Sequence, residues 1–158
     1  MTDGTRNGFK AVEGILKAAQ NTPVMGFAGL SDVASKVIQF TVPKNGEVTR
    51  LGIYDDGTGA GLTKINVKVW DKNPVATDPS EQGVAGINDI FTVDITGLPV
   101  APGTPQYIYD KNLSVVYKNN DTKQTTKLYV QLSGTAGVAF PAYAGNIRIA
   151  VKEADSYP

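Results

Sequence analysis

The chain has 158 residues, which is enough to bury a substantial core in a single domain without the help of metals or disulfides. Its 15 lysines and arginines are balanced by 15 aspartates and glutamates, so it lacks the positive field that attracts nucleic acid or an anionic membrane surface. It contains no cysteine and no histidine, which excludes Ser-His-Asp and Cys-His nucleophiles and ordinary zinc sites. We therefore expect a protein that is not an enzyme, holds no cofactor and has neither nucleic acid nor membrane as a partner.

Residues 1–36 have the composition of an N-terminal arm that docks on another surface. Apolar residues recur at helical spacing between residues 8 and 20 and predict a short amphipathic helix, which Pro23 ends. The segment after this proline is apolar but irregular. A helix this short is only marginally stable in water, so we expect the arm to cover its apolar side chains either on its own sandwich or on a partner. These side chains are Phe9, Val12, Leu16, Val24, Met25 and Phe27.

Residues 37–158 have the alternating apolar and polar pattern of short strands separated by turns, and we expect them to form one domain. Strands are predicted near residues 37–43, 47–54, 64–71, 89–96, 106–110, 113–118, 127–133 and 145–152. The pattern predicts an all-β fold, a two-sheet antiparallel β-sandwich of jelly-roll or immunoglobulin-like type.

The period of two residues along each strand also predicts which side chains face the core. The inward side chains are expected to be Ile38, Phe40, Val42, Ile65, Val67, Val69, Phe91, Val93, Ile95, Leu128, Val130, Leu132, Ile147, Ile149 and Val151.

The glycine-rich stretch GTGAGLTK at residues 57–64 resembles a phosphate-binding loop but fails its spacing. Both the P-loop and the dinucleotide fingerprint require a glycine where Leu62 stands, and both must open a helix, whereas a strand pattern follows here. We interpret the stretch as a hairpin connection between two strands. The adjacent Asp55 and Asp56 offer a start for a calcium site but lack the remaining ligand spacing, so solvated turn carboxylates are the favoured interpretation.

Several aromatic rings fall on the outward phase of their strands. Trp70 and Tyr129 are expected to face outward, and Tyr107 and Tyr109 flank an inward Ile108. Such rings can shield the sheet, stack on a sugar, or be buried against the arm, long loops or a neighbouring subunit. Of the functional alternatives we favour subunit contact, because the loops near these rings show no cluster of Asn, Asp and Arg that would orient a sugar.

The whole layout resembles the small capsid decoration proteins of tailed bacteriophages, also called cement or head-accessory proteins. The features in common are a leading arm, a β-sandwich without cysteine or histidine, abundant small residues and the short aromatic tail EADSYP. The resemblance implies a non-enzymatic virion structural protein on the capsid exterior that bridges major capsid proteins and self-associates as a homotrimer. It would be folded in the host cytoplasm, which agrees with the absence of a signal-peptide pattern in MTDGTRNGFK.

Under this resemblance the arm residues, together with Trp70 and Tyr129, would contact the partner. The stretch LGIYDDGTGAGLTKINVKVWD also resembles paired strands in bacterial surface and adhesin sandwiches. An alternative function is therefore a carbohydrate-binding or receptor-binding module of a tail fibre or adhesin, with Trp70 and Tyr129 as the sugar platform.

Overall fold

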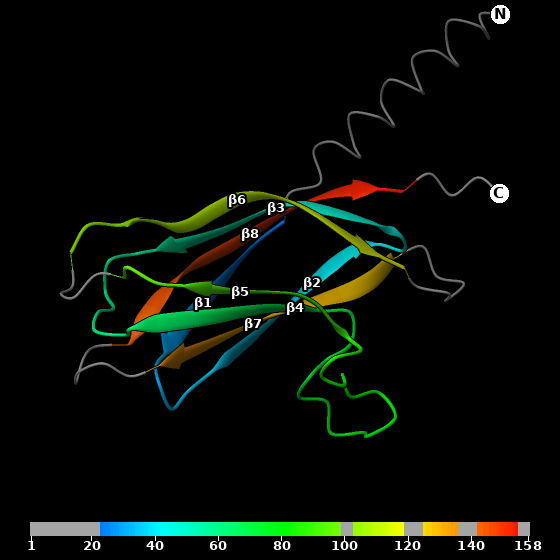
Figure 1. Ribbon diagram of the computed structural model, residues 1–158, viewed down its shortest axis with the longest axis horizontal. Coiled ribbons are helices and arrows are strands. Elements are labelled where there is room, and N and C mark those ends of the chain that lie inside the picture. The colour runs from blue at the N-terminus through cyan, green and yellow to red at the C-terminus, as the bar shows by residue number, and fades with distance from the viewer. Residues whose placement is uncertain (1–22, 99–102, 119–124, 136–141, 155–158) are drawn as a thin grey trace, which may run out of the picture.

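A computed structural model describes residues 23–98, 103–118, 125–135 and 142–154. These residues form two four-stranded antiparallel sheets that pack face to face (Figure 1). The strands are β1 (Val24–Leu30), β2 (Lys36–Pro43), β3 (Gly46–Asp55), β4 (Lys64–Trp70), β5 (Asp89–Ile95), β6 (Gln106–Tyr117), β7 (Thr125–Thr135) and β8 (Tyr143–Glu153). No helix of membrane-spanning length and hydropathy is found among the described residues.

The strand order identifies the sandwich as a jelly roll. The first sheet has the order β1-β8-β3-β6 and the second has the order β2-β7-β4-β5. The antiparallel pairs are therefore nested, with β1 on β8, β2 on β7, β3 on β6 and β4 on β5. This confirms the predicted all-β sandwich and selects the jelly roll from the two topologies expected.

The core lies between the two sheets and is formed by alternate residues of each strand. All the side chains predicted to face inward are buried except Phe91 and Val93, which are half-buried because β5 is an edge strand. The central strand β3 adds Val48, Leu51 and Ile53, each fully buried. Burial of one apolar face from each sheet is the main stabilising contribution to such a fold.

The segment expected to be irregular after Pro23 is in fact strand β1. It pairs with β8, and its Phe27 and Leu30 side chains are buried in the core. The register shifts between these two residues, and Gly29 there has a φ of 72°. The bulge interrupts the alternation of apolar and polar residues, which is why the sequence pattern did not indicate a strand.

The two strands predicted at 106–110 and 113–118 form the single strand β6. The residues between them resemble a turn in composition, but β3 pairs with the whole of β6. Arg50 of β3 also donates two hydrogen bonds to Asp110 at this point, at 2.7 Å each. Pairing with a neighbouring strand has therefore overridden the local turn preference of Asp110, Lys111 and Asn112.

The glycine-rich connection at residues 56–63 is not the hairpin that we expected. It joins β3 of the first sheet to β4 of the second sheet and so crosses between the layers. Gly59 packs so closely on Tyr143 that a Cβ atom there would lie 2.5 Å from the Tyr143 Cα atom. Leu62 follows as part of the core. The glycine serves close packing between the sheets rather than a tight two-strand turn.

Gly59→Ala should lower the free energy of unfolding by about 1–3 kcal/mol, because the new methyl group would overlap Tyr143. The matched control is Gly26→Ala in β1, where an added Cβ would meet its nearest atoms at an ordinary 3.7 Å. Urea denaturation followed by fluorescence measures both variants. Equal stability of the two variants would contradict the packing role of Gly59.

Candidate functional site

The outward face of the first sheet has a glycine at its centre. Gly52 of β3 lies opposite Asp110 of β6 on one side and Arg148 of β8 on the other. One row further along β3, Arg50 lies opposite Ala150 of β8. Because glycine has no side chain and alanine has a small one, the face is hollow where longer side chains surround it.

Two tyrosines border the hollow on the other side of Gly52. Tyr54 of β3 pairs with Tyr107 of β6, and their rings meet edge to face with centroids 5.2 Å apart. Tyr107 also reaches Gly52, since a Cβ atom on the glycine would lie 3.3 Å from the Tyr107 Cε1 atom. The Tyr107 side chain is nevertheless 45% exposed. One aromatic ring is thus held against the hollow and remains open to solvent.

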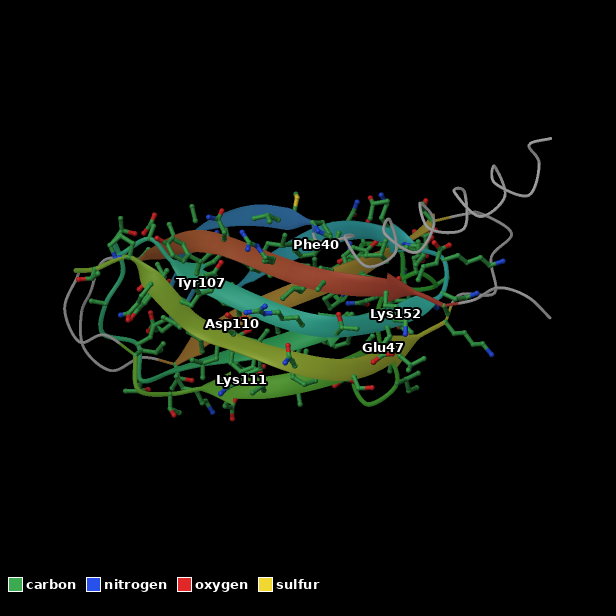
Figure 2. All side chains as sticks on the ribbon, turned by 90° about the horizontal axis from the view of Figure 1, so that it is seen from above. Phe40, Glu47, Tyr107, Asp110, Lys111 and Lys152 are labelled. Carbon is green, nitrogen blue, oxygen red and sulfur yellow. The ribbon has the colours of Figure 1, made fainter. Side chains whose placement is uncertain are left out.

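The hollow, which we call the Gly52 hollow, has a volume of about 270 Å³ and continues into a second depression of about 170 Å³. The two share Tyr107 and Arg148. The Gly52 hollow is lined by Arg50, Gly52, Tyr107, Asp110, Arg148 and Ala150, and the second depression by Val24, Tyr54, Tyr107, Asn146 and Arg148. Figure 2 looks onto this face and shows Tyr107 and Asp110 on β6 toward one end of the sheet, with Glu47 and Lys152 toward the other.

The charges around the Gly52 hollow do not cancel. Arg50 binds Asp110 through Nε and Nη2, each 2.7 Å from a carboxylate oxygen. These hydrogen bonds lower the pKa of the Asp110 carboxyl, and the positive charges of Arg50, Arg148 and Lys111 act in the same direction. Arg148 makes no ion pair and no side-chain hydrogen bond to any described residue. Its guanidinium leaves the hollow with an excess of one positive charge.

Trp70 does not form an exposed platform. It lies on the outer side of the second sheet but is only 5% exposed, and its Nε1 donates a hydrogen bond of 3.1 Å to Gln131 Oε1. Gly83 of the β4–β5 connection covers the ring so closely that a Cβ atom there would lie 2.9 Å from Cε3. The Lys68 ammonium lies 5.7 Å from the ring centroid. Of the alternatives weighed for this ring, burial under a long loop of the same chain is the observed one.

Tyr129 is half-buried on the same outer face, in a depression of about 490 Å³ between the β4–β5 connection and β7. Burial raises the pKa of the Tyr129 hydroxyl, and the negative charge of Glu81 adds to this rise. Lys72, Glu81 and Lys127 line the depression with several smaller polar residues. Tyr129 and Trp70 are therefore neighbours, but only Tyr129 is accessible.

The predicted arm residues fall into three groups. Phe27 is buried in the core, whereas Val24 and Met25 are 45% and 43% exposed at the free edge of β1. The remaining residues, Phe9, Val12 and Leu16, and the helix predicted around them lie outside the described residues.

Asp55 and Asp56 have different environments. Asp56 is exposed and accepts hydrogen bonds from the Thr58 backbone N–H and hydroxyl, which agrees with a solvated turn carboxylate. Asp55 is 1% exposed, and only its Oδ1 atom has a partner among the described residues, the Gly57 N–H at 3.0 Å. The expectation of a solvated carboxylate was therefore wrong for Asp55. The described residues contain no group of three or more His, Cys, Asp or Glu side chains placed to hold a metal ion.

Comparisons with known proteins give a general likeness only. The chain matches no family profile and no curated protein sequence. Among solved structures it is similar to T=1 particles derived from infectious bursal virus, with a TM-score of 0.41 and 11% identity over 89% of this chain. It spans about a third, 34%, of that capsid chain. It is also similar to a carbohydrate-binding module specific for non-crystalline cellulose, with a TM-score of 0.39 and 15% identity over 83% of this chain and 73% of the module. Neither likeness bears on what this chain binds.

Asp55→Asn should stabilise the protein at neutral pH. Burial raises the pKa of the Asp55 carboxyl, the Gly57 N–H opposes this rise and the charge of Asp56 adds to it. The folded state then binds the proton more tightly than the unfolded state, whose pKa is about 3.9, so stability falls as pH rises from that value through the raised pKa. Asparagine keeps the acceptor for Gly57 without the buried charge. We expect a melting temperature roughly 2–4 °C higher at pH 7, which corresponds to about 1 kcal/mol.

The gain in melting temperature should shrink as pH is lowered toward the ordinary aspartate pKa, because the carboxyl of the folded wild type is then protonated and no longer a buried charge. Asp32→Asn, an exposed position in the β1–β2 connection, is the control and should show no gain at neutral pH. Differential scanning calorimetry between pH 3.5 and 8 measures the melting temperature of each variant relative to wild type. A gain that is independent of pH would contradict the assignment to Asp55 ionisation.

Proposed function

We propose that this chain is a non-enzymatic virion structural protein that decorates and stabilises the capsid of a tailed bacteriophage by bridging major capsid proteins. The observation that supports this proposal is the free edge of β1. Strand β1 exposes the apolar Val24 and Met25, and Pro23 joins it to residues 1–22. Among the described residues it pairs with β8 only. It can therefore attach to another protein both through its backbone and through its side chains.

The β1 edge differs from the other edge strands of the described sheets. Charged residues or proline protect the other three edges from unwanted pairing, namely Lys36 and Pro43 in β2, Asp89 and Asp94 in β5, and Asp110 and Lys111 in β6. The β1 sequence VMGFAGL contains neither a charge nor a proline. An uncharged edge with an exposed methionine is suited to pairing with a partner, because methionine adapts its shape to irregular apolar surfaces.

Attachment of this kind stabilises a capsid without any chemical step. A protein that binds only the assembled shell shifts the equilibrium toward that shell by mass action. Several copies joined in one oligomer bind far more tightly than one copy, since each contact raises the effective concentration of the next. The homotrimer and the phage capsid come to this proposal from the resemblance in sequence layout. The sugar-binding alternative on Trp70 and Tyr129 is not proposed, because the Trp70 ring is buried.

Met25→Lys should weaken attachment to virions at least tenfold, because it places a charge on the β1 edge. Met25 pairs with the buried Ile147, so the melting temperature of the variant is measured to establish that its core is intact. Removal of residues 1–22 should also reduce attachment, and it leaves β1 whole. The measurement is co-sedimentation of tagged protein with virions of the phage whose genome encodes the chain, after growth without the native copy. Mass spectrometry of the particle fraction identifies the major capsid protein.

Val116→Lys is the control for the charge. Val116 is 69% exposed on β6, at the opposite edge of the same sheet, and its replacement should leave attachment unchanged. If Met25→Lys and Val116→Lys bind virions equally well, the β1 edge is not the attachment surface. If the wild-type protein does not co-sediment with virions, the proposed function itself fails.

At micromolar concentration, the purified protein should have a molar mass in solution three times that of a single chain. Self-association supplies the multiple contacts on which stable decoration depends. Equilibrium sedimentation over a range of concentrations measures the mass, and a monomer throughout that range would contradict the homotrimer.

A further inference from the structure

We propose that the Gly52 hollow binds an acidic sugar, with the sugar ring against Tyr107 and its carboxylate on Arg148. The hollow lies on the outer face of the first sheet, whereas the attachment surface proposed above is the β1 edge. The inference therefore does not depend on capsid attachment. It assigns a ligand site to side chains from β3, β6 and β8 that the topology brings together.

The first argument is the shape of the face. Glycine inside a strand is unfavourable by roughly 0.5–1 kcal/mol relative to alanine, and it commonly marks a place where another group approaches the backbone closely. Part of the space above Gly52 is taken by Tyr107, as expected for a ring that shields a glycine in a sheet. The shielding is incomplete, since a hollow of about 270 Å³ remains beside the ring. This volume is just below the range of small-molecule sites, roughly 300–1,000 Å³, and a second depression adjoins it.

The second argument is the chemistry of the walls. Tyr107 is 45% exposed, and the C–H face of a sugar ring can pack on an accessible aromatic ring because aromatic faces carry partial negative charge. The Asn146 amide and the carboxylate of Asp110, which the Arg50 hydrogen bonds hold in place, stand at the rim. These groups can exchange hydrogen bonds with sugar hydroxyls. An aromatic platform beside fixed polar groups is the arrangement expected for sugar recognition.

The third argument is the unbalanced charge. Arg50 and Asp110 neutralise each other, while Arg148 has no ion pair or side-chain hydrogen bond within the described residues. A guanidinium matches a carboxylate with two parallel hydrogen bonds. The excess of one positive charge thus favours a ligand with one negative charge over a neutral one. The aromatic platform favours a ligand with an apolar ring face over a simple inorganic anion.

The larger depression around Tyr129 is a weaker candidate. Its lysines are accompanied by Asp71 and Glu81, and its one aromatic ring is half-buried. The ammonium of Lys127 is also hydrogen-bonded, 2.5 Å from Thr41 Oγ1. The charges lining this depression, Asp71, Lys72, Glu81 and Lys127, balance, and its ring is less exposed than Tyr107, so it lacks the two features that define the Gly52 hollow.

The test uses the full chain on a glycan array that contains uronate-bearing, sialylated and neutral oligosaccharides, followed by calorimetric titration of the strongest hit. We expect binding to acidic glycans, weakened at higher salt because the contact is electrostatic. Tyr107→Ala and Arg148→Gln should each lower affinity at least tenfold, while Tyr107→Phe should retain most of it. Tyr129→Ala and Lys127→Ala, on the opposite sheet, are matched controls that should bind as wild type.

The inference would be overturned if the protein bound no acidic glycan or bound neutral glycans only. It would also be overturned if Tyr107→Ala bound acidic glycans as tightly as wild type. Titrations with inorganic phosphate and adenosine monophosphate separate a general anion site from a sugar site, and equal affinity for either would also overturn it. Circular dichroism and melting temperature establish that each variant is folded. Gly52→Ala, which partly fills the hollow and places a methyl group 3.3 Å from Tyr107 Cε1, should also lower affinity, and wild-type affinity in this variant would count against binding in the hollow.

Discussion

The burial of one face of each sheet against the other is the interaction on which the rest of this structure depends. Each sheet is apolar on one side only, so neither is stable alone and the two must pack together. The nested pairing of β1 with β8, β2 with β7, β3 with β6 and β4 with β5 brings distant parts of the chain into this arrangement. Once the inward faces are committed to the core, the outward faces and the strand edges are the surfaces left for binding.

The two outward faces are used differently. The β4–β5 connection folds over the second sheet and covers Trp70, so the largest ring in the chain contributes to internal packing. No connection among the described residues covers the Gly52 hollow, whose side chains are short at the centre and long at the rim. On the first sheet, the exposed Tyr107 ring and the Arg148 guanidinium therefore meet at one hollow. The face proposed for recognition and the β1 edge proposed for attachment adjoin each other, and they meet at Val24.

Two glycines of this chain, Gly52 in β3 and Gly59 in the β3–β4 connection, have opposite structural roles. Gly59 lies where the inter-sheet connection presses on Tyr143, and its lack of a side chain allows backbone and ring to touch. Gly52 lies on an outward face, and its lack of a side chain leaves space. Sequence context does not state what either glycine faces, since Gly52 lies within a strand pattern and Gly59 within the glycine-rich stretch. The difference arises from what the rest of the chain places opposite each glycine.

The sequence by itself determined the all-β class, most strand positions and most of the core, because alternation with a period of two is a local property of each strand. It did not reveal β1, whose bulge breaks that alternation, or the continuity of β6, whose turn-like residues are held in place by β3. It also misassigned the 56–63 connection, because no local signal states which sheet a strand joins. The Gly52 hollow was decided by tertiary structure alone. Tyr107 and Arg148 are far apart in the chain and meet only because β6 and β8 flank the same strand.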